Sequence, residues 1–488
     1  MLARSVLQWD KLPKIHSSLD DAAKHIESGM RVWIHGTTAT PTPLLHAISR
    51  RASELRGVEF AAVHTEGTCP YAEPGMQDSF RHNALFIAHN VRKACNDGRA
   101  FFTPIMLHQI PHLMRSGSFP VDASVLCVSP PDEHGFVSLG TNVVTTRQAI
   151  MSSKVVIAMV SEEMPRTFGD SQIHLSQIDH LVYHDMPNHE HFPKSSSDVQ
   201  KKIGDHVASL IEDGACLQTG FGGIADGVLK NLHNHQHLGV HTEMVSEGAV
   251  DLTTKGIVTN AKKAILPGKM VASFGLGSNK LYKFMDNNPL IDMRVVDYTN
   301  DPRNIAMNDK VVAINGAIEV DMLGQVVASQ IGSYVWSGIG GQLDFMTGAA
   351  MSKGGKPITA LPSTTSKGLP RIVPFINKGA AVDTGRYNAR YVVTEYGIAD
   401  LWGKTGRQRA ESLIKVCHPD HRDKLRYEAK KGAAVVTGRY NARYVVTEYG
   451  IADVWGKTGR QRAESLIKVC HPDHRDKLRY EAKKVNIL

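Results

Sequence analysis

The 488-residue chain lacks the features that mark several common protein classes. It has no run of about 18 apolar residues, so we expect no membrane span. No secretory signal peptide, G-x-S-x-G elbow or P-loop motif is present. None of its cysteines is paired as CxxC, which predicts free thiols in a reducing compartment. The six cysteines are Cys69, Cys95, Cys127, Cys216, Cys417 and Cys470.

A strong charge of one sign is also missing, although the net charge of +8 suggests one at first sight. Residues 432–484 hold 11 Lys/Arg and 6 Asp/Glu, a net of +5, and the remaining chain is therefore only +3. We predict no nucleic-acid partner on this ground. The start "MLARSVLQWDKLPK" is basic with a single acid, which predicts a mitochondrial presequence, with a cytoplasmic location as the alternative.

One block of 53 residues occurs twice. The sequence from Gly379 to Lys431 is repeated from Gly432 to Lys484, with only Asp383→Val436 and Leu401→Val454 changed. Within a block, "ARYVVTEYGIADL" predicts a strand followed by a turn, and "RQRAESLIKVC" has the apolar spacing of an amphipathic helix. A strand and a helix are too little to bury their own apolar faces, so a block should complete a larger sheet.

The rest of the chain alternates apolar strands with helices, which predicts α/β architecture with parallel sheets covered on both faces. A polar stretch at 183–200 reads as a linker, after which the pattern restarts. We therefore predict two α/β domains, residues 1–190 and 191–431, followed by the second copy of the block at 432–488. The strands expected in the first half are 31–36, 58–67, 101–107, 123–130 and 154–160, and the helices are 43–55 and 107–117.

The stretch "TGFGGIADG" (219–227) is a Gly-rich turn between a strand and a helix, where backbone N–H groups suit an anion. It also satisfies the loose G-x-G-x-x-G/A pattern, and Glu243 follows 18 residues after Ala225. A nicotinamide-binding domain is therefore one alternative. A purely structural tight turn is another. Glu243, where a strand leaves the sheet, is either a solvated loop acid or a nucleophile that attacks an activated acyl group.

A second Gly-rich turn, "SGIGGQLDF" (337–345), offers backbone donors to a developing oxyanion, or is simply a close approach of chains. Lys353 and Lys367 follow it beside glycines and could meet phosphates. Histidines cluster at 233–241, and Cys417, His418 and His421 lie together, but neither group has the spacing of a metal site. We predict no metal.

These pieces together resemble the acetyl-CoA hydrolase/transferase family, especially the 4-hydroxybutyrate and acetate CoA-transferases. The resemblance covers roughly residues 10–431. Its matching segments are "MPRTFGDSQIHLSQID" (164–179), "GFGGIADGVL" (220–229), "HTEMVSEGAVDL" (241–252), "AINGAIEVDMLGQVVASQIGSYVWSGIGGQLDF" (313–345), "SKGGKPITALPSTTSKG" (352–368) and "VVTEYGIADLWGKT" (392–405).

The resemblance implies two similarly folded α/β domains with the active site between them, and a nucleophile, Glu243, that forms a glutamyl-CoA thioester. It implies a second active-site carboxylate at Glu395, while we assign Glu319 a structural role. It also implies a set of CoA-binding residues, with the Ile224 amide as an oxyanion donor: Gly220, Phe221, Gly222, Gly223, Ile224, Gly341, Lys367 and, less directly, Lys353.

The expected activity is transfer of CoA between a short acyl-CoA, such as acetyl-CoA, and a short carboxylate such as acetate, succinate, butyrate or 4-hydroxybutyrate. CoA is then a substrate and covalent intermediate, and we expect no permanently bound cofactor and a homodimer as the candidate assembly. The alternatives are a short-chain acyl-CoA hydrolase, an NAD-dependent oxidoreductase and an inactive CoA-binding protein.

The family pattern ends near Lys431, so the second copy has no counterpart in it. Both copies carry the same glutamate, Glu395 and Glu448, and both cannot fill one place in one sheet. We predict that the first copy completes the second domain and that the second is peripheral. Near-identity of the copies indicates either a recent duplication or an artefact of the gene prediction.

Overall fold

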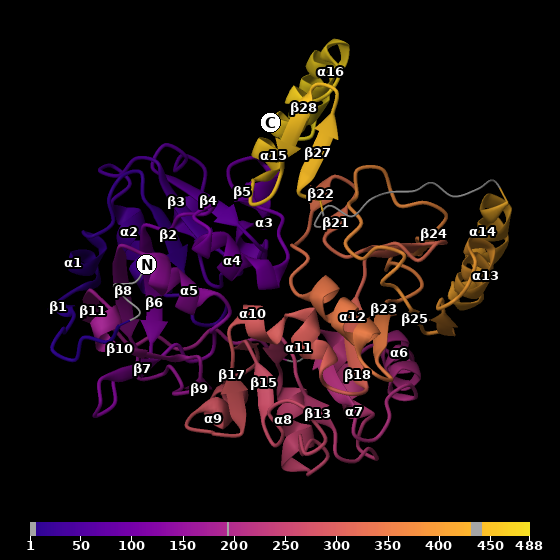
Figure 1. The fold of residues 1–488 in the computed structure, drawn as a ribbon, viewed down its shortest axis with the longest axis horizontal. Helices are drawn as coiled ribbons and strands as arrows, with labels where there is room; N and C mark the ends of the chain where they lie inside the picture. Colours follow the sequence, from indigo (N-terminus) through magenta and orange to yellow (C-terminus); the bar gives the residue numbers. More distant parts are fainter. Residues whose placement is uncertain (1–5, 193–194, 431–441) are drawn as a thin grey trace.

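The protein is described by a computed structural model over residues 6–192, 195–430 and 442–488 (Figure 1). Its first half is built on one sheet of eight strands that all pair in parallel. In spatial order these are β1 (Lys14–His16), β11 (His180–Tyr183), β8 (Val155–Val160), β6 (Ala123–Val128), β2 (Arg31–Ile34), β3 (Val58–Ala62), β4 (Phe80–Ala84) and β5 (Phe101–Phe102).

Continuous apolar sequence explains the central strands of this sheet. Every residue of β6 is buried, as expected for a parallel strand covered on both faces. The covering helices include α1 (Leu19–Ala23), α2 (Thr42–Arg50), α3 (His89–Asn96), α4 (Ile110–Arg115) and α5 (Thr146–Ser152). The prediction of α/β architecture with mostly parallel sheets is confirmed.

Several predicted elements in this half are longer than the observed ones. The strands expected at 31–36 and 58–67 end at Ile34 and Ala62. The strand expected at 101–107 is only β5, because Pro104 cannot donate to a sheet ladder. The helix expected at 43–55 ends at Arg50, and that at 107–117 is divided into a 3₁₀ turn, η3 (Leu107–Gln109), and α4. The break coincides with Pro111, which lies in the first turn of α4.

The second half is built on a six-stranded sheet. Its spatial order is β13 (Gly239–Val240), β12 (Cys216–Thr219), β18 (Val311–Gly316), β23 (Lys356–Ala360), β25 (Tyr391–Thr394) and β26 (Gly397–Asp400). The first five strands run in parallel, and β26 returns antiparallel to β25. Its helices include α6 (Asp198–Ala208), α7 (Gly223–Lys230), α8 (Glu247–Thr254), α11 (Pro302–Ala306), α12 (Gln342–Met351), α13 (Gly406–Val416) and α14 (Arg422–Ala429).

The two halves are joined by shared structure as well as by the linker. A three-stranded sheet pairs β9 (Phe168–Gly169) of the first half with β17 (Ile291–Met293) and β15 (Met270–Ala272) of the second. The expected linker ends where α6 begins, at a capping box formed by Ser197 and Gln200. The boundaries near residues 190 and 431 stay predictions. No helix among the described residues has the length and apolarity to cross a bilayer.

The first copy of the repeated block supplies the end of the six-stranded sheet. Its "YVVTEYGIAD" forms a hairpin of β25 and β26, so the predicted single strand with a turn is in fact two strands. The described part of the second copy forms a hairpin of the same kind, β27 (Tyr444–Thr447) and β28 (Gly450–Asp453), which pairs with no other described strand. It continues into α15 (Gly459–Lys468) and α16 (Pro472–Lys484).

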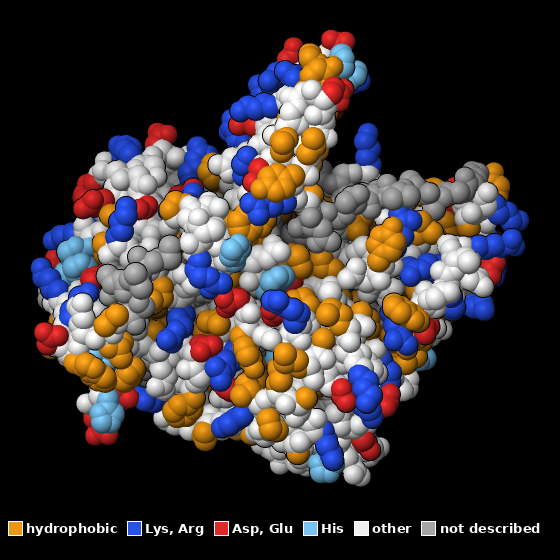
Figure 2. Space-filling model, viewed as in Figure 1, with side chains coloured by type: hydrophobic (Ala, Val, Ile, Leu, Met, Phe, Trp, Pro, Cys, Tyr) orange, Lys and Arg blue, Asp and Glu red, His pale blue; other side chains and the backbone are white. Residues whose placement is uncertain are grey.

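The same sequence is buried in one copy and exposed in the other. Val393 of β25 is fully buried, whereas its counterpart Val446 is 67% exposed. Tyr391 is 8% exposed and its counterpart Tyr444 56%. The second copy projects from the surface of the molecule, with hydrophobic side chains visible on it (Figures 1 and 2). Local sequence thus sets the hairpin and helices, while the available sheet edge decides burial.

An aromatic contact and a hydrogen bond attach the second copy to the first half of the chain, the latter from Nδ2 of Asn486 to the carbonyl oxygen of Asn96 at 3.3 Å. The ring of Trp455 packs beside His112, with centroids 5.5 Å apart, and its Nε1 lies 3.5 Å from Oε1 of Gln109. Trp455 joins the apolar cluster that contains Leu113 and lies against α4. The equivalent Trp402 of the first copy is 61% exposed, so the two copies use different surfaces.

The two substitutions between the copies explain which copy fits the sheet. The buried carboxylate of Asp383 accepts hydrogen bonds from the N–H groups of Ala328 and Ser329 at 2.6 and 2.7 Å, and from the Ser329 hydroxyl at 2.7 Å. A valine there would leave these donors without that partner. Leu401 is fully buried, and a valine would leave a void. Both differences favour the first copy in this place.

Candidate active site

The carboxyl ends of five parallel strands meet at one edge of the six-stranded sheet, and most of the predicted site residues lie there. Glu243 follows β13, the loop 220–224 follows β12, and Glu395 follows β25. Ligands of open α/β sheets bind outside this edge. The architecture therefore collects residues that are far apart in sequence.

Glu243 is held by backbone hydrogen bonds between two short strands, β13 and β14 (Met244–Val245). Its carbonyl oxygen accepts from the N–H groups of Ser273 and Phe274 at 2.9 and 3.1 Å. Its neighbour Thr242 donates through Oγ1 to the carbonyl oxygen of Thr219 at 3.3 Å. Thr219 ends β12 immediately before Gly220, so Glu243 and the loop 220–224 are adjacent.

The carboxyl group of Glu243 is partly buried and has two polar donors. Nδ2 of Asn300 donates to Oε2 at 2.9 Å, and the Gly341 N–H donates to the same carboxyl group. Burial raises the pKa of Glu243 to about 7, with the negative charge of Asp344 acting in the same direction and the two hydrogen bonds opposing it. At neutral pH this carboxyl therefore exists in both protonated and ionised forms.

The second Gly-rich turn lies directly against Glu243 and leads into α12. A Cβ atom at Gly341 would overlap Oε2 of Glu243 and Nδ2 of Asn300, so only glycine fits. Gly340 has a φ of +57°, in the left-handed region that favours glycine. A Cβ atom there would lie 3.5 Å from Cε2 of Phe86 in the first half. The turn is thus enclosed between Glu243 and the other half of the chain.

A polar chain continues from Asn300 to the first half of the molecule. Asn300 also hydrogen-bonds the carboxylate of Asp344, and Oδ1 of Asp344 lies 2.8 Å from Nδ1 of His108. Burial raises the pKa of Asp344. Burial opposes protonation of His108, but its hydrogen bond to Asp344 and the negative charges of Asp344 and Asp301 together raise its pKa. Since His108 lies in η3, this chain ties the position of Glu243 to the contact between the two halves.

The loop Gly220–Ile224 is open to its surroundings. Gly222 has a φ of +105°, and apart from chain neighbours no atom of the described residues lies within 4 Å of where a Cβ at Gly220 or Gly222 would be. Phe221 is 67% exposed. Gly223 and Ile224 begin α7, where the first N–H groups of a helix have no intrahelical partner. The loop can therefore accept an anionic or carbonyl oxygen close to Glu243.

The predicted site residues Glu395 and Lys367 follow other strands than Glu243 and loop 220–224 do. Glu395 accepts from the Ser363 N–H at 2.9 Å and from the Ser363 hydroxyl at 2.6 Å. Its strand β25 is four positions from β13, about 19 Å at the usual strand spacing, so it contacts Ser363 and not Glu243. Lys367 lies in the exposed turn Thr365–Gly368 after β23, at the same edge of the sheet.

The position of Lys353 does not fit its predicted contact with CoA. It precedes β23 and its carbonyl accepts from Lys310 N–H at 2.8 Å, just before β18. These residues lie at the amino ends of the strands, opposite the edge that holds Glu243 and loop 220–224, so Lys353 is dropped from the proposed CoA contacts. Glu319 is buried in β19 (Glu319–Asp321) and hydrogen-bonded to Asn377, in keeping with a structural role.

Sequence reasoning missed three residues of the site: Asn300, His108 and Phe86. Each comes from a segment with no motif of its own, and each reaches the site only through long-range packing. Asp344 was visible within "GGQLDF", but its contact with the first half was not.

Comparison with known proteins places the chain in a family. The family model of the acetyl-CoA hydrolase/transferase N-terminal domain matches residues 6–189. The model of the corresponding C-terminal domain matches residues 277–429 and again residues 426–482. The chain belongs to the acetyl-CoA hydrolase/transferase family. The second match of the C-terminal domain falls on the second copy of the block.

Curated relatives make the enzyme class more specific. The chain is 45% identical over 420 residues to a succinyl-CoA:acetate/propanoyl-CoA:succinate CoA transferase of Fasciola hepatica, covering 85% of this chain and 87% of that one. It is 44% identical over 427 residues to a 4-hydroxybutyrate coenzyme A transferase of Clostridium kluyveri, covering 87% and 100%. The chain is accordingly a CoA-transferase. The alternative of an NAD-dependent oxidoreductase, drawn from the glycine pattern at 220–225, was wrong.

Solved structures agree with the fold. The 4-hydroxybutyrate CoA-transferase of Porphyromonas gingivalis has a TM-score of 0.74 at 37% identity, and RipA of Yersinia pestis has 0.79 at 33%. Each match covers 86% of this chain and 97% of the other.

Proposed function

We propose that this CoA-transferase moves CoA between acetyl-CoA and short carboxylates through a glutamyl-CoA thioester on Glu243. The observation that carries the proposal is the Glu243 carboxyl group, partly buried, bracketed by the donors of Asn300 and Gly341, and adjacent to the open loop 220–224. The substrates named for the relatives, acetate, succinate, propanoate and 4-hydroxybutyrate, are all short carboxylates.

The proposed reaction passes through an acyl-glutamyl anhydride and a glutamyl-CoA thioester. An ionised Glu243 oxygen attacks the thioester carbonyl carbon of acetyl-CoA, and the C–S bond breaks to give an acyl-glutamyl anhydride and CoA thiolate. The thiolate attacks the glutamyl carbonyl carbon, acetate leaves, and a glutamyl-CoA thioester remains. A second carboxylate reverses these steps and departs as its CoA ester. The energy of the thioester bond is conserved in the anhydride and in the glutamyl-CoA thioester, so the reaction requires no ATP.

The two donors on Glu243 have a specific task in the second step. When one Glu243 oxygen is acylated, the other becomes a carbonyl oxygen that gains negative charge as the thiolate adds. The Asn300 amide and the Gly341 N–H already point at this carboxyl group and can stabilise that oxyanion. The Ile224 N–H, at the start of α7, is the candidate donor for the oxyanion on the substrate acyl group. Removal of one such donor typically costs about 10²–10³ in rate.

Isotope exchange tests the proposal. A ping-pong transferase exchanges labelled acetate into acetyl-CoA without any second acceptor, because acetyl-CoA and enzyme alone form the glutamyl thioester and free acetate. A hydrolase instead releases free CoA thiol with no exchange, which is the alternative that the family name also allows. Exchange with negligible thiol release supports transfer, and thiol release without exchange contradicts it.

Location and assembly belong to the same proposal. We place the enzyme in mitochondria on the basic start of the sequence and on the family resemblance, and we propose a homodimer as its assembly. Imaging of a C-terminally tagged chain and light scattering of the purified protein test these two points.

A further inference from the structure

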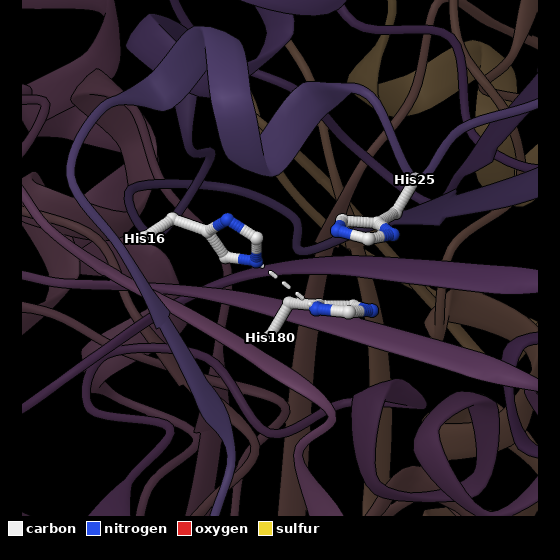
Figure 3. Close-up of side chains that lie close together, drawn as sticks. All are labelled: His16, His25 and His180. Carbon is white, nitrogen blue, oxygen red and sulfur yellow. Dashed lines mark hydrogen bonds between the residues drawn. The ribbon is translucent and has the colours of Figure 1, made fainter.

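Three histidines that play no part in the proposed reaction lie together at the edge of the eight-stranded sheet. His16 ends the edge strand β1, His25 follows α1, and His180 begins β11 (Figure 3). Among the described residues, this is the one group of three or more His, Cys, Asp or Glu side chains whose potential ligand atoms all lie within 4.8 Å of one another.

We propose that His16, His25 and His180 bind one divalent transition-metal ion of the zinc class. Imidazole nitrogen is a preferred ligand of Zn²⁺, and three histidines with an open fourth position form a known zinc arrangement. All three rings are partly exposed, so water can reach that fourth position.

The distances fit such an ion after modest side-chain rotation. Nε2 of His16 and Nδ1 of His180 lie 3.1 Å apart. Two ligand nitrogens of a tetrahedral zinc ion are about 3.3 Å apart, for Zn–N bonds of about 2.05 Å. These two atoms are therefore already at the required separation. The proton that they share in the absence of metal would be displaced by the ion.

His25 must turn for the site to close. Its ring stacks on that of His180 at 3.5 Å with an angle of 12° between the planes. Lone pairs in parallel planes cannot converge on one ion, so the His25 ring has to rotate out of the stack. His25 lies one residue after the C-cap of α1, Lys24, and is half-buried, so its ring is not enclosed in the core.

The charge state of the cluster suits a metal. Burial and the neighbouring imidazoles lower the pKa of His180 to about 4, and burial also lowers the pKa values of His16 and His25. The surrounding charges are mixed: Lys14 and Arg51 oppose protonation, while Asp21, Glu27 and Asp179 favour it. The rings are thus neutral near pH 7, which is the form that binds metal.

A bound ion would fasten the first strand to the sheet. β1 has three residues and is connected to α1 by a short turn, and among the described strands it pairs only with β11. An ion shared by β1, β11 and the end of α1 would join all three elements. The ring contacts of the three histidines are with one another and not with Glu243, Asp344 or loop 220–224, so we expect the ion to stabilise the fold and not to take part in CoA transfer.

The test is a metal titration of the full-length chain against a chromophoric chelator for Zn²⁺. We expect wild type and the matched control His134→Ala, which removes an exposed histidine of the same half, to bind one tight equivalent. His16→Ala, His25→Ala and His180→Ala should each lower the affinity at least about tenfold, the loss given for even an outer partner of a metal ligand. Acetate exchange should be unchanged in all of them.

A second measurement needs no variant and guards against misfolding. Zn²⁺ should protect His16, His25 and His180 of the wild-type chain from diethylpyrocarbonate, as mapped by peptide mass spectrometry, and should leave His134 reactive. The proposal is overturned if the variant that combines His16→Ala, His25→Ala and His180→Ala binds Zn²⁺ as tightly as wild type. It is equally overturned if zinc leaves the three histidines as reactive as before.

Discussion

The raised pKa of Glu243 predicts that removing its charge will stabilise the protein while abolishing its activity. In the folded chain this pKa is about 7 instead of 4.5, chiefly because the group is buried. At about 1.4 kcal/mol per pH unit, the ionised group costs the folded state at most about 3.5 kcal/mol above pH 7. Glu243→Gln resembles the protonated state and does not ionise.

The sign of the effect follows from proton binding. Between pH 4.5 and 7 the folded state binds this proton and the unfolded state has lost it, so the free energy of unfolding of wild type falls as pH rises through this window. The variant lacks that contribution. Glu243→Gln should therefore match wild type in thermal stability at pH 4.5 and exceed it increasingly up to about pH 7, beyond which the difference is constant.

Activity should change in the opposite direction. The attacking oxygen must be ionised, so kcat/KM of wild type should fall tenfold per pH unit well below pH 7. Glu243→Gln should lose at least about 10⁴ in acetate exchange, as expected for loss of a covalent nucleophile. Thermal unfolding from pH 5 to 8, with the exposed-acid variant Glu133→Gln as control, measures the stability effect. A Glu243→Gln curve parallel to wild type would refute the raised pKa.

Three further predictions concern the turn and the repeat. Gly341→Ala should lower exchange at least about 10²-fold, because its side chain would overlap Glu243, and a normal thermal unfolding curve would separate this from misfolding. Glu395→Gln should impair exchange while Glu448→Gln leaves it unchanged, and loss only in Glu448→Gln would mean that the second copy occupies the sheet. Asp383→Val should destabilise the chain by about 3 kcal/mol, against about 1 kcal/mol for Leu401→Val, measured by thermal unfolding; equal effects would contradict the hydrogen-bond argument.

The sequence predicted those parts of the fold whose causes are local. Buried parallel strands such as β6 carry continuous apolar sequence, and the capping boxes at Thr405 and Thr458 start the same helix in both copies. The local sequence does not distinguish the burial of the two copies, and the prediction that the first copy completes the sheet rested on chain connectivity. Val393 and Val446 have the same neighbours in sequence, yet only the first lies against the edge of β23.

The candidate site also contains residues that local sequence motifs predicted and residues that they did not. Glu243 and loop 220–224 were found because each lies in a motif beside a strand end. Asn300 contacts Glu243, which lies 57 residues away in sequence, and His108 contacts Asp344, which lies 236 residues away. No short sequence pattern encodes contacts over such separations. The cluster at His16 and His180 was missed for the same reason, since 164 residues separate the two.

Direct chemical trapping tests the central claim most sharply. The enzyme is incubated with acetyl-CoA, treated with borohydride, which reduces a thioester to an alcohol, and mapped by peptide mass spectrometry. The account predicts that the peptide containing "HTEM" carries Glu243 reduced to the alcohol, and that this product disappears when excess acetate is added before the borohydride. A reduced residue in any other peptide, or none at all in an enzyme that exchanges acetate, would contradict it.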